Sequence, residues 1–216
     1  MRIFLAAAIL VASSVGTQAY SPSASRRSFL QEIGGAAAAA GAAATSFGPA
    51  VANAAQDFKV GGKIVLGDES IMAQKEHGTS SIPVQKNLRY NVDNNLADRI
   101  TNYNRRFAEM GGYFQSTEFE KVVRASETPV TFYDSNSGRP LFVAPVDRSV
   151  DSFIEESKVH GWPSFRDNEV VWDNVRVLKN SGETVSVDGT HLGHNLPDRS
   201  GNRYCINLVS VAGNPV

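Results

Sequence analysis

The stretch Val175–Val211 reads VRVLKNSGETVSVDGTHLGHNLPDRSGNRYCINLVSV and carries the clearest evidence of the fold class. Short runs rich in β-branched and aromatic residues alternate here with turn residues such as Asn180-Ser181-Gly182 and Asp188-Gly189. Glycine can take the positive φ that tight hairpin turns need, so the pattern predicts short antiparallel strands. The strands expected across this region are Val130–Tyr133, Leu141–Pro145, Val170–Trp172, Val175–Leu178, Thr184–Val187 and Tyr204–Val211.

A helical segment is expected before the strands. Five apolar residues recur at spacings of four and three, which predicts one face of a helix that ends at Gly111-Gly112. The side chains expected to pack in the core from this face are Leu96, Ile100, Tyr103, Phe107 and Met110. Thr117-x-x-Glu120 is typical of a capping box and predicts a second helix through about Val123. Smaller elements are expected at Lys63–Leu66 (a strand) and Ser152–Ser157 (a helical turn).

Together these elements predict an α+β protein, with a mostly antiparallel β core of two small sheets behind an N-terminal helical segment. The chain has 216 residues, which after loss of a leader leaves one domain with a core of its own. We expect three segments: a targeting leader at 1–54, an arm and helical segment at 55–125, and a catalytic domain at 126–216.

The first segment resembles two export signals in series. Met1–Ala19 has an arginine, an apolar run and then small residues, as in a secretory signal. Arg26-Arg27 opens a twin-arginine pattern, and Ala52-Asn53-Ala54 provides a second cleavage site. Two signals in series predict that the chain crosses more than one membrane. Tyr20 after the first cleavage site resembles the plastid presequences of algae with complex plastids, and the second signal resembles an address to the thylakoid lumen, with plain secretion or export as the alternative. Ile33–Ala44 is too short and too rich in alanine to span a membrane, so no stable insertion is expected once the leader is cleaved before Ala55.

Composition argues against several classes of function. The net charge is −1, and a mildly acidic body is not expected to bind nucleic acid. The single cysteine, Cys205, allows no internal disulfide and no paired Cys-x-x-Cys zinc site. What remains is one free thiol in a chain with four histidines.

Cys205 is expected on a strand, where alternation places Arg203 and Asn207 on its own face. A guanidinium and an amide beside the sulfur favour the thiolate, which predicts a lowered pKa for this cysteine. His191 and His194 are expected in a loop or turn near this strand, where either can move protons near neutral pH. A thiol in such surroundings is a candidate nucleophile.

Three more side chains complete the candidate site. Asp198 is expected to orient His194 or to hold a water molecule. Trp162 offers a flat apolar wall, and Phe165 is expected in the core with a second role in touching the substrate. Such a site suits attack on a small polar group carried by an apolar stem.

Three motifs in this order, Gly161–Phe165 (GWPSF), His191–His194 (HLGH) and Arg203–Asn207 (RYCIN), resemble the B-type methionine sulfoxide reductases. The resemblance covers about Thr128–Val211 and includes Gly138–Phe142 ahead of the first core strand. It implies reduction of methionine-(R)-sulfoxide in peptides and proteins, a repair of oxidative damage that passes through a sulfenic acid on the cysteine.

The resemblance also implies a role for each matched residue. Cys205 would attack the sulfoxide sulfur, His194 would bind or protonate the sulfoxide oxygen, and His191 would line the pocket. Asp198 and Arg203 would position water and lower the pKa of the cysteine. The remaining matches are Asn207 as an active-site amide and Trp162 as the wall for the terminal methyl of the substrate.

The chain departs from the family pattern in two ways that bear on cofactors and partners. Asp134, Ser137, Val185 and Asp188 stand where many members have zinc-binding cysteines, so neither zinc nor another cofactor is expected. His160 stands where some members carry a resolving cysteine. Turnover would therefore need an external thiol, and the resemblance implies thioredoxin, glutaredoxin or glutathione as the reductant.

Two other functions remain open on the sequence. Cys205, His191 and His194 form a His2Cys set of the kind that binds one copper or zinc ion. Alternatively, the chain is a non-catalytic lumenal interaction subunit that kept the fold. Metal analysis tests the first alternative and a Cys205→Ser variant tests the second.

Overall fold

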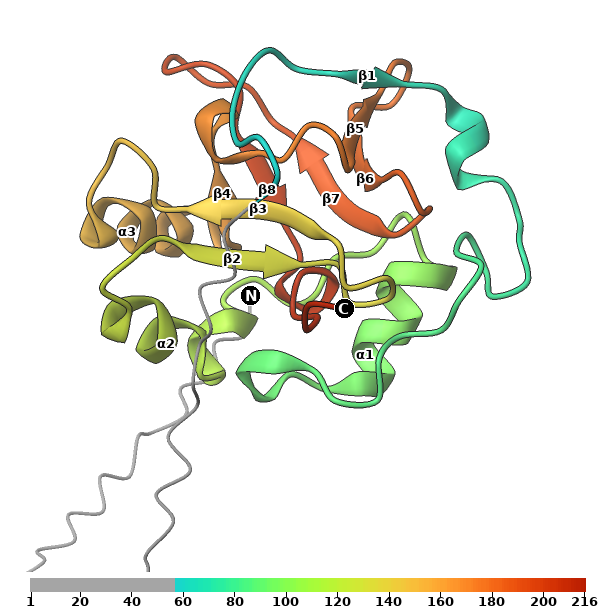
Figure 1. Ribbon diagram of the computed structural model, residues 1–216, viewed down its shortest axis with the longest axis horizontal. Helices are drawn as coiled ribbons and strands as arrows, with labels where there is room; N and C mark the ends of the chain where they lie inside the picture. Colours follow the sequence, from blue (N-terminus) through green and yellow to red (C-terminus); the bar gives the residue numbers. More distant parts are fainter. Residues whose placement is uncertain (1–56) are drawn as a thin grey trace, which may run out of the picture. The chain divides into compact units, whose positions relative to one another are not determined.

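The computed structural model describes residues 57–216, and the predicted leader at 1–54 with its lumenal address lies outside the described residues. The described residues form an α+β fold with mostly antiparallel strands in two sheets, which confirms the predicted fold class (Figure 1). Within this range, no helix is long and apolar enough to cross a membrane.

The larger sheet has six strands in the order β1-β5-β6-β7-β8-β4. β1 and β5 are parallel, and every other neighbouring pair is antiparallel. The tight turns that enter β6 and β7 use Gly182 and Gly189 at φ of 71° and 95°, as the turn pattern predicts. The strands are β1 (Leu66–Gly67), β4 (Ser164–Phe165), β5 (Val175–Leu178), β6 (Glu183–Ser186), β7 (His191–Asn195) and β8 (Tyr204–Ile206).

The smaller sheet is a hairpin of β2 (Val130–Tyr133) and β3 (Pro140–Ala144). The α-helices of the described range are α1 (Asn94–Asp98), α2 (Phe119–Ala125) and α3 (Val150–His160). Figure 1 shows α2 and α3 beside the same end of this hairpin, and α3 also contacts β4. Short 3-10 turns lie at Glu69–Met72, Arg89–Asn91, Tyr113–Ser116, Asp167–Glu169 and Leu208–Ser210.

α3 delivers the chain to the candidate site. The Ser149 hydroxyl accepts the N–H of Ser152 at the first turn, and Gly161 ends the helix in the left-handed region at φ 86°. Trp162 and β4 follow at once, so the helix end fixes where the GWPSF motif enters the sheet.

A cluster of phenylalanine rings fills the core between the hairpin, the helices and β4. Phe165 lies at its centre, stacked on Phe142 at 4.3 Å between ring centroids and edge-on to Phe132 at 5.1 Å. Phe119 of α2 and Phe153 of α3 close the cluster from the helical side. Each of these five side chains is fully buried, and rings of this size supply much of the apolar area that stabilises a small domain.

The long helix expected through Met110 is wrong in its second half. α1 continues as one π-helical turn, Arg99–Tyr103, and the chain leaves the helix at Asn104. The last three apolar residues of the expected face are exposed: Tyr103 by 56%, Phe107 by 65% and Met110 by 82%. The polar residues between them, Arg105 and Glu109, contact the sheet region instead, and these contacts override the helical period.

The other predictions are confirmed in part. β2 and β5 have the predicted bounds, while the strand expected at Val170–Trp172 is reduced to one bridge between Phe142 and Val170. The strand expected through Val211 ends at Ile206, and the single turn expected at Ser152–Ser157 is part of the 11-residue helix α3. The largest miss is β7, which was expected as a loop.

The predicted capping box is wrong, although the helix after it is present. Glu118 is the N-cap of α2 and makes no capping hydrogen bond with its side chain, while the Thr117 hydroxyl oxygen accepts the N–H of Phe119 at 3.2 Å in the turn before the helix. The Glu120 carboxylate does not return to the cap, because it accepts from Arg124 at 2.9 Å and from Lys158 of α3 at 3.0 Å.

Candidate functional site

A bulge in β7 brings both histidines of the HLGH motif to one face of the sheet. Residues three apart in a regular strand point to opposite faces, because side chains alternate. Here Val185 pairs with His191 and Glu183 pairs with His194, so Leu192 is the extra residue of a bulge. The two imidazole rings therefore share a face, with centroids 5.7 Å apart and an edge-on arrangement.

Cys205 lies on β8 directly across from His194. The register pairs Cys205 with His194 on one side and with Ser164 of β4 on the other. Side chains directly opposite each other in antiparallel strands have Cβ atoms about 4.5–5.5 Å apart. The thiol is half-buried, so the structure brings a partly accessible sulfur and an imidazole together on one face.

Close approach of the two strands accounts for the glycine of the HLGH motif. A Cβ atom on Gly193 would lie 2.0 Å from the carbonyl oxygen of Cys205 and 3.0 Å from the Cα of Ile206. β7 and β8 therefore leave no room for a side chain at this point. Gly193 is thus what lets His194 and Cys205 face each other.

The thiol of Cys205 is held in its protonated form. Burial raises its pKa above the ordinary value of 9.0, the Arg203 guanidinium lowers it, and the charge of Glu109 raises it further. The predicted low pKa is therefore wrong, because the half-buried sulfur loses more hydration than the guanidinium compensates. At neutral pH the sulfur is a thiol that needs a base.

His194 carries the imidazole opposite this thiol. It is half-buried, and burial lowers its pKa below the ordinary value of 6.5, with a further lowering from His191. A neutral imidazole at pH 7 can accept the proton of a thiol opposite it. The pair Cys205 and His194 therefore combines a protonated thiol with an unprotonated imidazole.

His191 does not line the pocket, contrary to expectation, because it is only 1% exposed. Its Nδ1 lies 2.7 Å from Oε1 of Glu183, and since a carboxylate only accepts, Nδ1 donates. Glu183 is bound in turn by Arg105 of the arm, with Nη2 2.5 Å from Oε2. The buried His191 ring therefore packs against the ring of His194, and the hydrogen bond to Glu183 fixes the orientation of His191.

Arg203 is buried beside Cys205 with part of its guanidinium unused. A hydrogen bond from the Arg203 side chain is one of the causes that lower the pKa of Cys205. The Nε and Nη1 atoms of Arg203 have no hydrogen-bond partner among residues 57–216, although Nε lies 3.4 Å from Oδ2 of Asp198 outside hydrogen-bond geometry. Buried donors without a partner are costly and rare. They mark a place where the oxygen of a ligand can bind next to the sulfur.

Asp198 does not orient His194, contrary to expectation. Its carboxylate is exposed and accepts from Arg166 at 2.8 Å and 3.1 Å and from the N–H of Ser200 at 2.8 Å. The Arg166 hydrogen bonds hold the pKa of Asp198 well below its usual range, at about 2. Asp198 is therefore a permanently charged neighbour of Arg203 on the outer side of the site.

Trp162 stands at the edge of the site and is bound to the arm. Its indole Nε1 donates to the carbonyl oxygen of Glu109 at 3.0 Å. Its ring packs on Gly111, where a Cβ atom would lie 3.4 Å from Cη2. Trp162 precedes by two residues the Ser164 that pairs with Cys205, and it is half-buried, as a wall open to solvent requires.

Asn207 is buried, and its amide is used inside the protein. Its Nδ2 donates to the carbonyl oxygen of Leu192 in the β7 bulge at 3.1 Å. Its Oδ1 accepts the backbone N–H of Glu109 at 3.0 Å. Asn207 therefore ties β7, the residue after β8 and the arm together.

Phe165 is not a substrate contact in this structure. It is fully buried at the centre of the phenylalanine cluster, stacked on Phe142. The alternation of β4 explains this placement, since Ser164 is on the Cys205 side and the next residue points to the opposite face. Its expected role in the core is confirmed.

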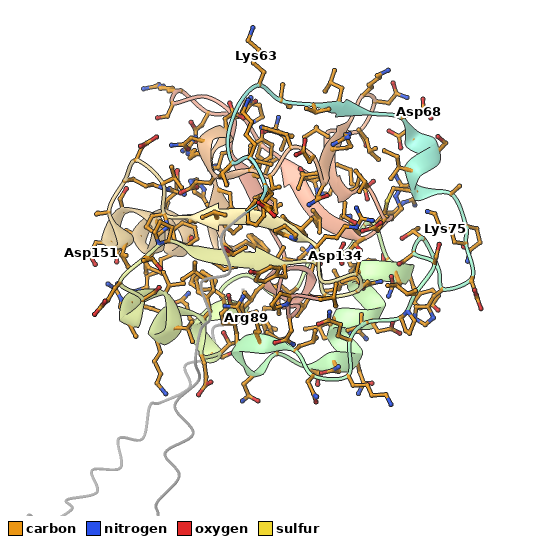
Figure 2. The ribbon with its side chains drawn as sticks, in the orientation of Figure 1. Lys63, Asp68, Lys75, Arg89, Asp134 and Asp151 are labelled. Carbon is orange, nitrogen blue, oxygen red and sulfur yellow. The ribbon has the colours of Figure 1, made fainter. Side chains whose placement is uncertain are left out.

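A buried carboxylate occupies one of the positions where zinc ligands were considered. Asp134 follows β2 (Figure 2), is fully buried, and accepts the hydroxyl hydrogen of Thr190 at 2.9 Å. Burial raises its pKa, while the N–H of Asn136 and the hydroxyls of Ser186 and Thr190 oppose that rise. This hydrogen bonding links the small sheet to the turn before β7.

The donor atoms of Cys205, His191 and His194 do not converge as metal ligands do. Among the described residues, the group whose ligand atoms all lie within 4.8 Å of one another is Glu156, His160 and Asp198. Both carboxylates of that group already bind Arg166, whose positive charge opposes a cation there. A surface crevice lined by Met72, Tyr103, Arg105 and Arg106 lies in the arm, and none of the site residues expected from the sequence lines it.

Sequence reasoning missed three residues that complete this arrangement: Arg105, Glu109 and Glu183. Glu183 is signalled only by its place opposite His194, which requires the register of β6 and β7. No known protein-family model matches the chain, and no curated protein matches it either.

Proposed function

We propose that this protein is a thiol-dependent enzyme that reduces methionine-(R)-sulfoxide in peptides or proteins, with Cys205 as the nucleophile. The proposal rests above all on the half-buried thiol that lies across from His194 and beside the unpaired donors of Arg203. A nucleophile, a base and an oxygen-binding group then meet at one point, which is what reduction of a sulfoxide requires.

The reaction can be written with these groups alone. His194 accepts the thiol proton as the sulfur of Cys205 attacks the sulfoxide sulfur, while the sulfoxide oxygen binds the free N–H groups of Arg203. The proton passes from His194 to that oxygen. The bond between oxygen and the methionine sulfur then breaks as the OH group passes to the sulfur of Cys205, and the new sulfur–sulfur bond breaks as methionine leaves. Methionine leaves with two more electrons than the sulfoxide had, and Cys205 is oxidised to a sulfenic acid.

Regeneration needs two thiol equivalents, because the chain has no second cysteine. The first forms a mixed disulfide with Cys205 and releases water, and the second frees the cysteine as a disulfide of the reductant. Thioredoxin, glutaredoxin and glutathione are the candidate reductants. The proposed place of this repair is the thylakoid lumen, and attachment of residues 1–54 to a fluorescent protein tests that address.

Sequence motifs support the choice of substrate. GWPSF, HLGH and RYCIN occur in the order typical of B-type methionine sulfoxide reductases. Trp162 provides a half-buried aromatic surface at the edge of the site. We infer the preference for the R-epimer from this resemblance of the motifs.

The decisive experiment is an assay of the purified protein on the separate R- and S-epimers of dabsyl-methionine sulfoxide, with dithiothreitol as reductant. We expect turnover of the R-epimer only. Turnover of the S-epimer alone, or of neither epimer, would contradict the proposal.

A Cys205→Ser variant distinguishes an enzyme from a non-catalytic subunit with the same fold. The hydroxyl keeps the size of the side chain, so thermal stability should change little while turnover falls below detection. Dimedone should label the wild type after exposure to substrate without reductant, and mass spectrometry should place the adduct on Cys205. Stoichiometric copper or zinc in the purified protein, with no dimedone adduct, would instead favour a metal-binding function.

A further inference from the structure

Glu109 is a buried acidic residue that the proposed chemistry does not use. It lies in the arm, outside the motifs of the site, and is only 2% exposed. Its two carboxylate oxygens accept the N–H groups of Leu208 at 2.8 Å and Val209 at 3.1 Å, just beyond β8. No cationic side chain of the described residues pairs with it in an ion pair.

The backbone of the same residue binds both sides of the site. Its carbonyl oxygen accepts the indole N–H of Trp162, and its N–H donates to Oδ1 of Asn207, each at 3.0 Å. Two residues on, Gly111 packs under the Trp162 ring, and the N–H of Gly112 donates to the carbonyl oxygen of Gly161 at 2.7 Å. The arm therefore runs along the GWPSF motif and is joined to it at several points.

The side chain of Glu109 also acts on the sulfur through its charge. Its carboxylate is one of the groups that raise the pKa of the Cys205 thiol. Burial raises the pKa of Glu109 itself to about 7, against the lowering effect of the two backbone N–H groups. The other titratable groups that face these two are Tyr113 of the arm, whose pKa Glu109 also raises, and His194 and Arg203 around the thiol.

We infer that Glu109 is a positioning residue of the Cys205 site, through which the arm fixes Trp162 and Asn207 and sets a negative charge within reach of the thiol. The inference goes beyond the proposed function, because it concerns the resting state of the sulfur. When Glu109 is ionised, its negative charge disfavours the thiolate, so Cys205 stays protonated until a base removes the proton.

Alkylation of Cys205 by iodoacetamide tests this without any sulfoxide, so its outcome does not depend on the proposed function. The probe reacts with thiolate, and the chain has one cysteine, so the rate reports this site alone. Glu109→Gln should raise the rate at pH 8 by about three- to tenfold, because a charge near the thiolate is removed. Glu127→Gln, at an exposed position just after the arm, is the matched control and should leave the rate unchanged. An unchanged rate in a folded Glu109→Gln protein would overturn the inference.

A second measurement decides the matter if Glu109→Gln does not fold. In a His194→Asn protein, which lacks the imidazole opposite the thiol, the logarithm of the alkylation rate should rise with a slope below one around pH 7. The slope is lower there because Glu109 ionises over the same pH range, and its negative charge reduces the fraction of Cys205 that is thiolate. A slope of one throughout pH 6–8 would contradict the inference.

Discussion

The β region, residues 126–216, and the arm, residues 57–125, contribute to the site in different ways. The β region places Cys205, His194 and Glu183 by strand register, so neighbouring pairs fix their positions. The arm has only short helices, and places Arg105 and Glu109 by several hydrogen bonds and an ion pair to the β region. Register brings Cys205 and His194 together, and the arm contributes Glu109, whose charge is one of the causes that raise the pKa of Cys205. Each contribution can be broken separately.

The largest effect is expected from breaking the register. Gly193→Ala puts a Cβ atom 2.0 Å from the carbonyl oxygen of Cys205, so β7 and β8 must separate. We expect a loss of about 3 kcal/mol or more in the free energy of unfolding, measured with urea, together with loss of turnover. Gly111→Ala is the control, since its new Cβ meets only ordinary contacts and should cost less than about 1 kcal/mol. Equal stability of the two variants would show that the strand contact is looser than described.

The next effect concerns the buried carboxylate of the arm. The pKa of Glu109 is raised from 4.5 to about 7, so the folded protein binds a proton that the unfolded chain releases. Its contribution to stability is therefore fully present below pH 4.5 and is lost as the pH rises to 7. Glu109→Gln should remove this dependence, which amounts to at most about 3 kcal/mol between the two limits. Thermal unfolding of both proteins from pH 4 to 8 checks it, and parallel curves would refute it.

Breaking the ion pair between the arm and β6 should have a smaller effect. Burial raises the pKa of Glu183, but hydrogen bonds from His191 and Arg105 outweigh it and leave the pKa below 4.5. The stability that these bonds contribute is present above pH 4.5 and is lost as the pH falls below it. Arg105→Ala should cost about 1–2 kcal/mol at pH 7 and make the acid transition shallower, since a partner of a buried carboxylate is lost. Arg106→Ala, at an exposed neighbour, is the control and should behave as the wild type.

The smallest effect on the reaction is expected in the core. Phe165→Leu removes a ring that stacks on Phe142 at 4.3 Å, and should cost about 1–2 kcal/mol of stability. The KM for a methionine sulfoxide peptide should stay within about twofold, because the side chain is fully buried behind β4. Trp162→Leu, at the open edge, should raise KM. A large rise of KM in Phe165→Leu alone would restore its expected role as a substrate contact.

The sequence predicts the β region better than it predicts the arm. β2 and β5 have their predicted bounds because valine, threonine and aromatic residues prefer strands locally. β7 was missed because two histidines, a glycine and an asparagine are weak strand formers, and their conformation depends on β6 and β8 on either side. The bulge that turns both imidazoles to one face has no signal in the motif itself.

The arm was harder to predict because a helical period dominated it. The spacing from Leu96 to Met110 fits a helix, yet the chain unwinds after Tyr103 where Arg105 and Glu109 find partners in the β region. The low pKa expected for Cys205 failed for a similar reason. Neighbours such as Arg203 are visible in the sequence, whereas burial and a charge from a distant segment are not.

The position of Cys205 in the sheet has a kinetic consequence. β7 and β4 flank the sulfur on both sides, so it is approached only from the face that it shares with His194. In an enzyme of the proposed kind, the oxidised peptide and the regenerating thiol would have to use this one opening in turn. Double-reciprocal plots at several reductant concentrations should then be parallel lines, and excess peptide should inhibit by occupying the reduced and oxidised forms alike.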